Sequence, residues 1–366
     1  MISQLEKFGL NLVLFAKLLG TNVIGLVFLL FLLVNKRALK LNFRELLFIG
    51  AVLLQLIFSF ILSGNNYACL TNTIFYFSFL IVYVALKDKN SEDLIRLLRY
   101  MIISAFLFTL IEFIVLNSPL TSYVWYFSEE HAHRSVISGL QRAQGLGAIS
   151  SSSSAIAVFS LALYSIVVGK SSRLYEMIVF TTVLLLMSGT GFFLLIAYIF
   201  LHMWINSGGA FKKLVKFIGF ISLLVLAIDF FELIGLNRFT FDYFFQIYEL
   251  KINLYKEKVF DSSISSMFFG GQSNISDPLI VTSSDFAIMG IFDSMGIYST
   301  ILILSAPLWI IGLQRQFQII LILYWLSLLH YPAIGSPIGC FFFGLCLALC
   351  RNSAQKNQKL KITQGS

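Results

Sequence analysis

Residues 100–117 read YMIISAFLFTLIEFIVLN, an apolar run in which Glu112 is the one charged residue. A bilayer core about 30 Å thick needs roughly 20 such residues in a helix. This stretch therefore predicts a membrane-spanning helix, and similar stretches recur along the whole chain.

The composition agrees with that prediction. Of the 366 residues, 58% are hydrophobic and 12% are charged, whereas a soluble domain carries about 25% charged residues. The 38 Phe and only 5 Pro fit long apolar helices. These values exclude a soluble globular enzyme, a disordered chain, a DNA-binding domain and a disulfide scaffold.

We predict an all-α polytopic integral membrane protein with about 11 transmembrane helices (10 to 12), forming one membrane domain over residues 1–366. The candidate spans are 8–34, 45–63, 67–86, 100–117, 149–168, 174–188, 190–206, 217–235, 286–311, 317–331 and 338–350. The first span is too long for a cleavable signal peptide and contains Lys17. We count it as one tilted helix, although residues 2–18 could instead form an interfacial helix.

The basic residues predict the orientation, because cytoplasmic loops of membrane proteins are enriched in Lys and Arg. Most of the 26 basic residues lie in alternate connections, at 36–44, 87–99, 170–173, 212–216 and 315, and in the tail 351–366. We assign these segments to the cytoplasm, which puts the N-terminus outside. The net charge of +8 is thus mainly a topology signal, and we expect no nucleic-acid partner.

Two long extracytoplasmic loops result, 118–148 and 236–284. Long loops in compact helical proteins are usually functional or disordered, and aromatic residues such as Trp125 argue against disorder. Within the second loop, Phe241 to Phe260 has aromatic and aliphatic residues at helical spacing, which predicts an amphipathic helix on the outer membrane surface. It could be a surface anchor or the wall of a groove for a lipid-linked substrate.

Three basic residues of the outer loops are candidates for binding phosphate: Arg134, Arg142 and Arg238. Arg binds phosphate oxygens in a bidentate manner and keeps its proton. A solvated role is the alternative for each.

Acidic residues gather toward the same outer side, at Glu112, Asp229, Glu232, Asp285 and Asp293. Acids within the membrane are costly and suggest a polar cavity, but acids near helix ends can also be structural. Together they predict a chamber that opens outward. His330, at the outer end of its span, could act as a general base, or could hydrogen-bond to a neighbouring carbonyl.

Two small-residue segments lie beside this chamber. Ser150 to Ser154 starts a span and is expected to allow close helix packing, with sugar contact as a second possibility. Ser188 to Gly191 forms a tight outer turn that would expose a helix N-terminus, a possible anion site. His131 and His133 lie beside two Glu, but this spacing is a weak metal signal, and we predict neither a metal nor another cofactor.

In the order of these features the chain resembles the Wzy-type O-antigen polymerases, which share a superfamily with the O-antigen ligases. Arg134 followed by Gly145 matches an Arg-x10-Gly pattern of polymerase outer loops, and Gln141 to Leu146 is similar to the family's entry into the next span. Ser188 to Gly191 looks like a Ser-Arg-(Ser/Thr)-Gly turn in which Gly189 replaces the Arg. The segment from Ser284 to Ile297 resembles the one that follows the large loop, without the ligases' His.

The resemblance implies a glycosyltransferase of the bacterial inner membrane. It would move a glycan from undecaprenyl pyrophosphate onto a lipid-linked repeat unit at the outer face, with a chain-length regulator as a possible partner. The arginines would stabilise the pyrophosphate, and Asp285 or His330 would be the base. The alternatives are a transporter or flippase of lipid-linked saccharide, which would show internal repeats and polar groups at the midplane, and an O-antigen ligase.

Overall fold

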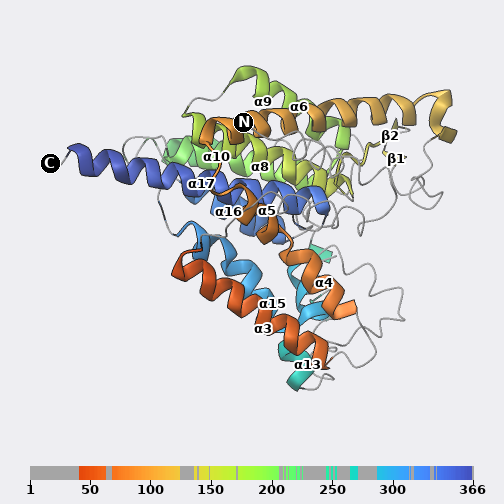
Figure 1. Ribbon diagram of the computed structural model, residues 1–366. Helices are drawn as coiled ribbons and strands as arrows, with labels where there is room; N and C mark the ends of the chain where they lie inside the picture. The colour runs from red at the N-terminus through yellow and green to blue at the C-terminus, as the bar shows by residue number, and fades with distance from the viewer. Residues whose placement is uncertain are drawn as a thin grey trace.

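The computed structural model describes residues 41–62, 68–123, 136–137, 140–147, 149–169, 172–205, 214–219, 264–270, 287–312, 317–329 and 336–364, and isolated residues or pairs between these ranges. The chain is mostly helical there (Figure 1). The main helices are α3 (Phe43–Leu62), α4 (Ala68–Phe77), α5 (Phe79–Leu86), α6 (Ser91–Leu116), α8 (Ser150–Val168), α9 (Arg173–Leu186), α10 (Gly189–Ile205), α13 (Ile264–Phe269), α15 (Ala287–Ile310), α16 (Gln318–Leu328) and α17 (Pro337–Gln364).

Four of the described helices are long and apolar enough to cross a membrane: Phe43–Ile61, Ser91–Leu116, Ser150–Val168 and Pro337–Ala354. Shorter apolar helices cover Leu70–Leu86, Gly189–Ile205, Ser294–Ile310 and Gln318–Leu328. The prediction of an all-α membrane protein is therefore confirmed. The number of eleven spans stays a prediction, because 8–34 and most of 217–235 lie outside the described residues.

Two boundaries differ most from the sequence prediction. Helix α6 begins at Ser91, before the predicted 100, because Asn90 caps it by accepting a hydrogen bond from the Glu92 N–H (3.3 Å). Glu92 and Asp93 also place negative charge in its first turn. Helix α17 continues through the segment predicted as a tail, up to Gln364.

The predicted outer loop 118–148 contains a short helix and a two-stranded hairpin. The 3-10 helix η2 (Pro119–Tyr123) follows α6, and the strands β1 (Val136–Ile137) and β2 (Leu140–Gln141) pair in an antiparallel hairpin. The loop thus returns to the end of α6 before α8 begins.

The helices form two groups in Figure 1. One group contains α5, α6, α8, α9, α10, α16 and α17, and the other contains α3, α4, α13 and α15. At the centre of the first group α5 packs tightly on α17, where a Cβ on Gly344 would lie 2.6 Å from the Phe79 carbonyl oxygen. The Tyr324 and Phe343 rings stack there with centroids 4.6 Å apart.

A buried charge cluster joins the beginning of α3, the end of α5 and the last helix. Glu45 is 3% exposed, and its carboxylate lies 2.6 Å from Lys87 Nζ and 2.5 Å from Arg351 Nη1. The Tyr83 hydroxyl donates to the same carboxylate. Three segments that the charge pattern assigns to the cytoplasm therefore meet at one end of the molecule.

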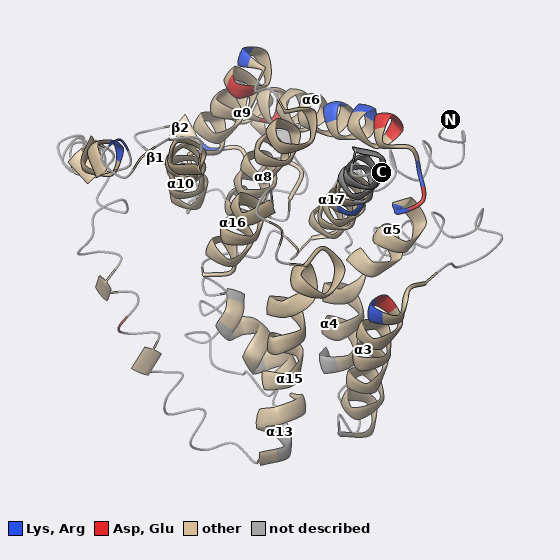
Figure 2. Ribbon diagram, turned by 90° about the vertical axis from the view of Figure 1, so that its left-hand side faces the viewer, with Lys and Arg blue, Asp and Glu red and all other residues tan. Residues whose placement is uncertain are grey.

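The residues predicted to face inward and outward lie at opposite ends of α6. Arg99 donates to the Tyr164 hydroxyl (3.3 Å) near the end of α8, whereas Glu112, about 20 Å farther along the axis, contacts residues of the outer loop. Figure 2 looks at the molecule from the end that the charges predict to be cytoplasmic, with basic residues near the beginnings of α3, α6 and α9. The predicted cytoplasmic and outer groups thus lie at opposite ends of α6, and the orientation of these ends in the membrane stays a prediction.

Candidate functional site

The predicted outer ends of α6, α8 and α9 hold residues 140–147, which we call the return segment. Asn117, just after α6, binds this segment twice: its Nδ2 donates to the Gln141 carbonyl (2.8 Å), and its Oδ1 accepts from the Gln141 N–H (2.8 Å). This reciprocal pair fixes the end of the hairpin on α6.

Glu112 fixes the same segment a few residues later. Its Oε2 accepts hydrogen bonds from the backbone N–H groups of Gln144 (2.9 Å) and Gly145 (2.6 Å), and the residue is 3% exposed. A buried carboxylate with two such donors is well stabilised. Glu112 could line a polar cavity or could have a structural role, and these contacts favour the structural role of positioning the return segment.

Ser153 of α8 holds the return segment from the other side. Its hydroxyl accepts from the Gly147 N–H (2.8 Å) and donates to the Gln144 carbonyl (2.5 Å). Gly145 has φ +70°, and a Cβ there would lie 2.7 Å from the Ser153 Cβ. The serine run therefore packs against the return segment as small residues allow.

The turn from Ser188 to Gly191 is buried except at Gly189, contrary to the expectation that the turn as a whole exposes a helix N-terminus. Ser188 and Thr190 are 0% and 7% exposed, and the Ser188 hydroxyl donates to the Ser151 hydroxyl (3.2 Å). A Cβ on Gly191 would lie 2.5 Å from the Ser154 Cβ. Because α8 covers the turn, we do not assign it an anion site.

Arg142 lies in the middle of the return segment, half-buried and with interactions of its own. Its main chain is anchored on both sides, by Asn117 before it and by Glu112 after it. The Ala143 N–H adds a bond to the Leu185 carbonyl (3.3 Å). The structure thus holds this guanidinium-bearing residue in a fixed place at the outer end of the helices.

The other four predicted site residues lie outside the described residues. They are Arg134, Arg238, Asp285 and His330. Asp229, Glu232, His131, His133 and most of the predicted amphipathic helix from Phe241 to Phe260 also lie outside them. For Asp293 the structure describes the backbone, within α15. The structure therefore does not test whether these groups come together with Arg142.

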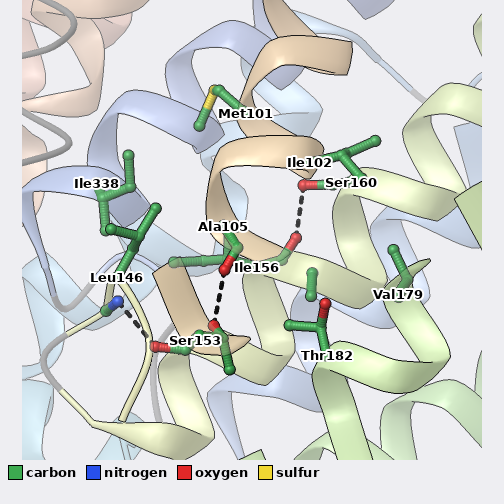
Figure 3. Close-up of a pocket in the computed structure, with 13 residues that line it drawn as sticks. Met101, Ile102, Ala105, Leu146, Ser153, Ile156, Ser160, Val179, Thr182 and Ile338 are labelled. Atoms are coloured by element: carbon green, nitrogen blue, oxygen red, sulfur yellow. Dashed lines mark hydrogen bonds between the residues drawn. The ribbon is translucent and has the colours of Figure 1, made fainter. Parts of the chain in front are cut away.

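A small cavity lies between α6, α8 and α9 (Figure 3). Leu146 and Gly147 of the return segment line it, and its volume of about 20 Å³ suits one water rather than a sugar. The hydroxyls of Thr109, Ser160 and Thr182 on its walls each donate to a carbonyl one turn earlier in the same helix. We regard the cavity as packing space beneath the return segment.

The sequence interpretation missed Asn117 and the Glu45 cluster. Asn117 ends an apolar span, where a polar side chain can reach a following loop, and this position was a usable signal. Glu45, Lys87 and Arg351 are far apart in the sequence, so that spacing alone does not pair them.

Within the described part of the chain, no group of three or more His, Cys, Asp or Glu residues could hold a metal ion. Comparison with protein-family models, with curated proteins and with solved structures finds no match to this chain.

Proposed function

We propose that the protein is a membrane glycosyltransferase of the O-antigen polymerase type. It would transfer a glycan from undecaprenyl pyrophosphate to a lipid-linked repeat unit at the outer face of the bacterial inner membrane. The membrane fold supports the location, and the resemblance of the return segment to polymerase loops supports the reaction.

The observation that carries the proposal is the anchoring of Arg142. Asn117, Glu112 and Ser153 bind the main chain around it through side-chain hydrogen bonds. A cation that is positioned before the reaction stabilises developing charge without further reorganisation. Such a group is what a pyrophosphate leaving group requires.

The proposed reaction has simple chemistry. A hydroxyl of the acceptor sugar attacks the anomeric carbon of the donor glycan, the bond from that carbon to the pyrophosphate oxygen breaks, and the hydroxyl proton passes to a base. Undecaprenyl pyrophosphate leaves with the bonding electrons. Arg142, with Arg134 and Arg238, would stabilise its charge, and Asp285 or His330 would accept the proton.

One structural feature fits the rival function of a transporter for lipid-linked saccharide. Helix α15 is broken at Gly296, within the apolar part of the chain, and broken helices line the substrate sites of many transporters. An O-antigen ligase is the second rival.

Deleting the gene in its host separates these functions. Loss of a polymerase leaves a surface core capped with a single repeat unit and no ladder on a gel. Loss of a flippase or a ligase leaves no cap. An uncapped core would refute the polymerase proposal.

The role of Arg142 is tested by Arg142→Ala and Arg142→Lys in the complemented deletion strain, at matched membrane abundance. We expect at least about a tenfold loss of ladder for Ala, the loss expected of a charge-stabilising donor, and a smaller loss for Lys, which lacks the planar fork. Arg173→Ala, an exposed arginine at the opposite end of the helices, is the matched control. Wild-type ladders from abundant Arg142→Ala protein, alone or combined with Arg134→Ala, would contradict the phosphate-binding role.

A further inference from the structure

Two helices meet through their backbones at the break in α15. Gly296 has φ 78° and ψ 175°, and a Cβ there would collide with the Phe268 carbonyl oxygen and would lie 2.5 Å from Gly270 N. Gly270, just after α13, has φ 79°, and its Cβ would lie 2.7 Å from the Met295 Cα. The main chain before the break therefore lies directly against the end of α13.

Gln55 of α3 is directed into this junction and is 0% exposed. Its Nε2 lies 3.0 Å from the Ser59 hydroxyl, 3.2 Å from the Phe269 carbonyl and 3.1 Å from the Met295 carbonyl. An amide nitrogen has two hydrogens, so it cannot satisfy three acceptors with full bonds. The junction thus has more acceptors than donors.

The amide oxygen adds to this imbalance. Within the described part of the chain no group donates to Gln55 Oε1, although the atom is buried. An unsatisfied buried acceptor costs about 1–3 kcal/mol and usually indicates a missing water or ion.

Ser299, one turn after Met295, shows the effect of the same break. Its buried hydroxyl has no hydrogen-bond partner among the described residues, whereas Ser294 and Thr300 of the same helix bond to the carbonyls four residues earlier. The corresponding carbonyl for Ser299 is that of Met295, which accepts from Gln55 instead. Beside the break, Gln55 Oε1 and Ser299 Oγ are thus two buried polar atoms with no partner in the described part of the chain.

We propose that this junction binds a monovalent cation, Na⁺ or K⁺. Oxygen atoms are the ligands that hard cations prefer, and rotation of the Gln55 amide about its last bond turns Oε1 toward the oxygens of Ser59, Phe269 and Met295. That rotation assembles four uncharged oxygen ligands. The absence of charge among these four favours a monovalent over a divalent ion, and broken membrane helices commonly present carbonyls to such ions.

The test is the thermal stability of the purified full-length protein in detergent, measured in NaCl, KCl and choline chloride at equal ionic strength. A ligand that binds the folded state raises Tm in a concentration-dependent manner, and at ten times Kd we expect a rise of about 2 °C for a chain of this length. Gln55→Leu should abolish the rise, and Gln55→Glu should reach half-saturation at lower cation concentration. Gln318→Leu, at an exposed glutamine, should keep the wild-type response.

Two results would overturn the proposal. One is a Tm that stays unchanged with the concentration of all three salts, for both the wild type and Gln55→Glu, which would indicate a bound water at the junction. The other is an equal rise with choline, which would indicate a general salt effect. If Gln55→Leu does not fold, the Gln55→Glu titration still decides between these outcomes.

Discussion

Replacing Glu112 by Ala should release the return segment from α6. The substitution removes the acceptor of the Gln144 and Gly145 N–H bonds, of 2.9 and 2.6 Å, at a site that is 3% exposed. A hydrogen bond to a charged group contributes about 1.5–3 kcal/mol. Since the two bonds share one oxygen, we expect a loss of about 3 kcal/mol in the free energy of local opening, or roughly a hundredfold in its equilibrium constant.

Hydrogen–deuterium exchange read by mass spectrometry on a peptide covering residues 141–149 measures this opening. Glu112→Ala should exchange about a hundredfold faster there, and Glu112→Gln, which keeps an uncharged acceptor, about tenfold faster. Glu92→Gln, at an exposed position in the first turn of the same helix, is the control. Unchanged protection in Glu112→Ala would show that Asn117 and Ser153 hold the segment without Glu112.

Two further substitutions test the packing and the charge cluster. Gly191→Ala places a Cβ 2.5 Å from the Ser154 Cβ and should destabilise the protein by about 1–3 kcal/mol. Gly50→Ala, whose Cβ meets nothing within 4 Å, is the control and should leave the stability unchanged. Equal unfolding midpoints of the two variants in detergent titrations would contradict the close packing of α8 and α10. Lys87→Met leaves the buried Glu45 with fewer partners and should cost about 3 kcal/mol, whereas Lys212→Met, at an exposed lysine, should cost less than about 0.5 kcal/mol. Equal stability of the two Lys variants would mean that Arg351 and Tyr83 suffice for the carboxylate.

The apolar runs predicted the described helices because hydrocarbon permits few alternatives for a backbone with unsatisfied polar groups. The span 149–168, for example, agrees closely with α8 at Ser150–Val168. The break at Gly296 was not foreseen, because a single Gly within an apolar run does not reveal that a second backbone lies against it.

The candidate site was predictable in part. A phosphate-binding role for Arg142 follows from residue type and position, but its anchoring depends on Glu112 and Asn117, which reach it across the chain. From the sequence, Glu112 could have had either a functional or a structural role. The two backbone N–H groups that donate to its carboxylate favour the structural role. The remaining predicted site residues, Arg134 and Asp285 among them, stay predictions.

The position of α17 has a consequence for biogenesis. This helix is synthesised after the other described helices, yet residues Ile338 to Cys350 are largely buried at the centre of the bundle, against α5, and Arg351 contacts Glu45 at the beginning of α3. Until α17 leaves the ribosome, the surfaces of Phe79 and Val82 that it covers have no protein neighbour there, and Glu45 lacks one of its two cations. Membrane insertion can proceed helix by helix, but assembly of this bundle waits for the synthesis of α17.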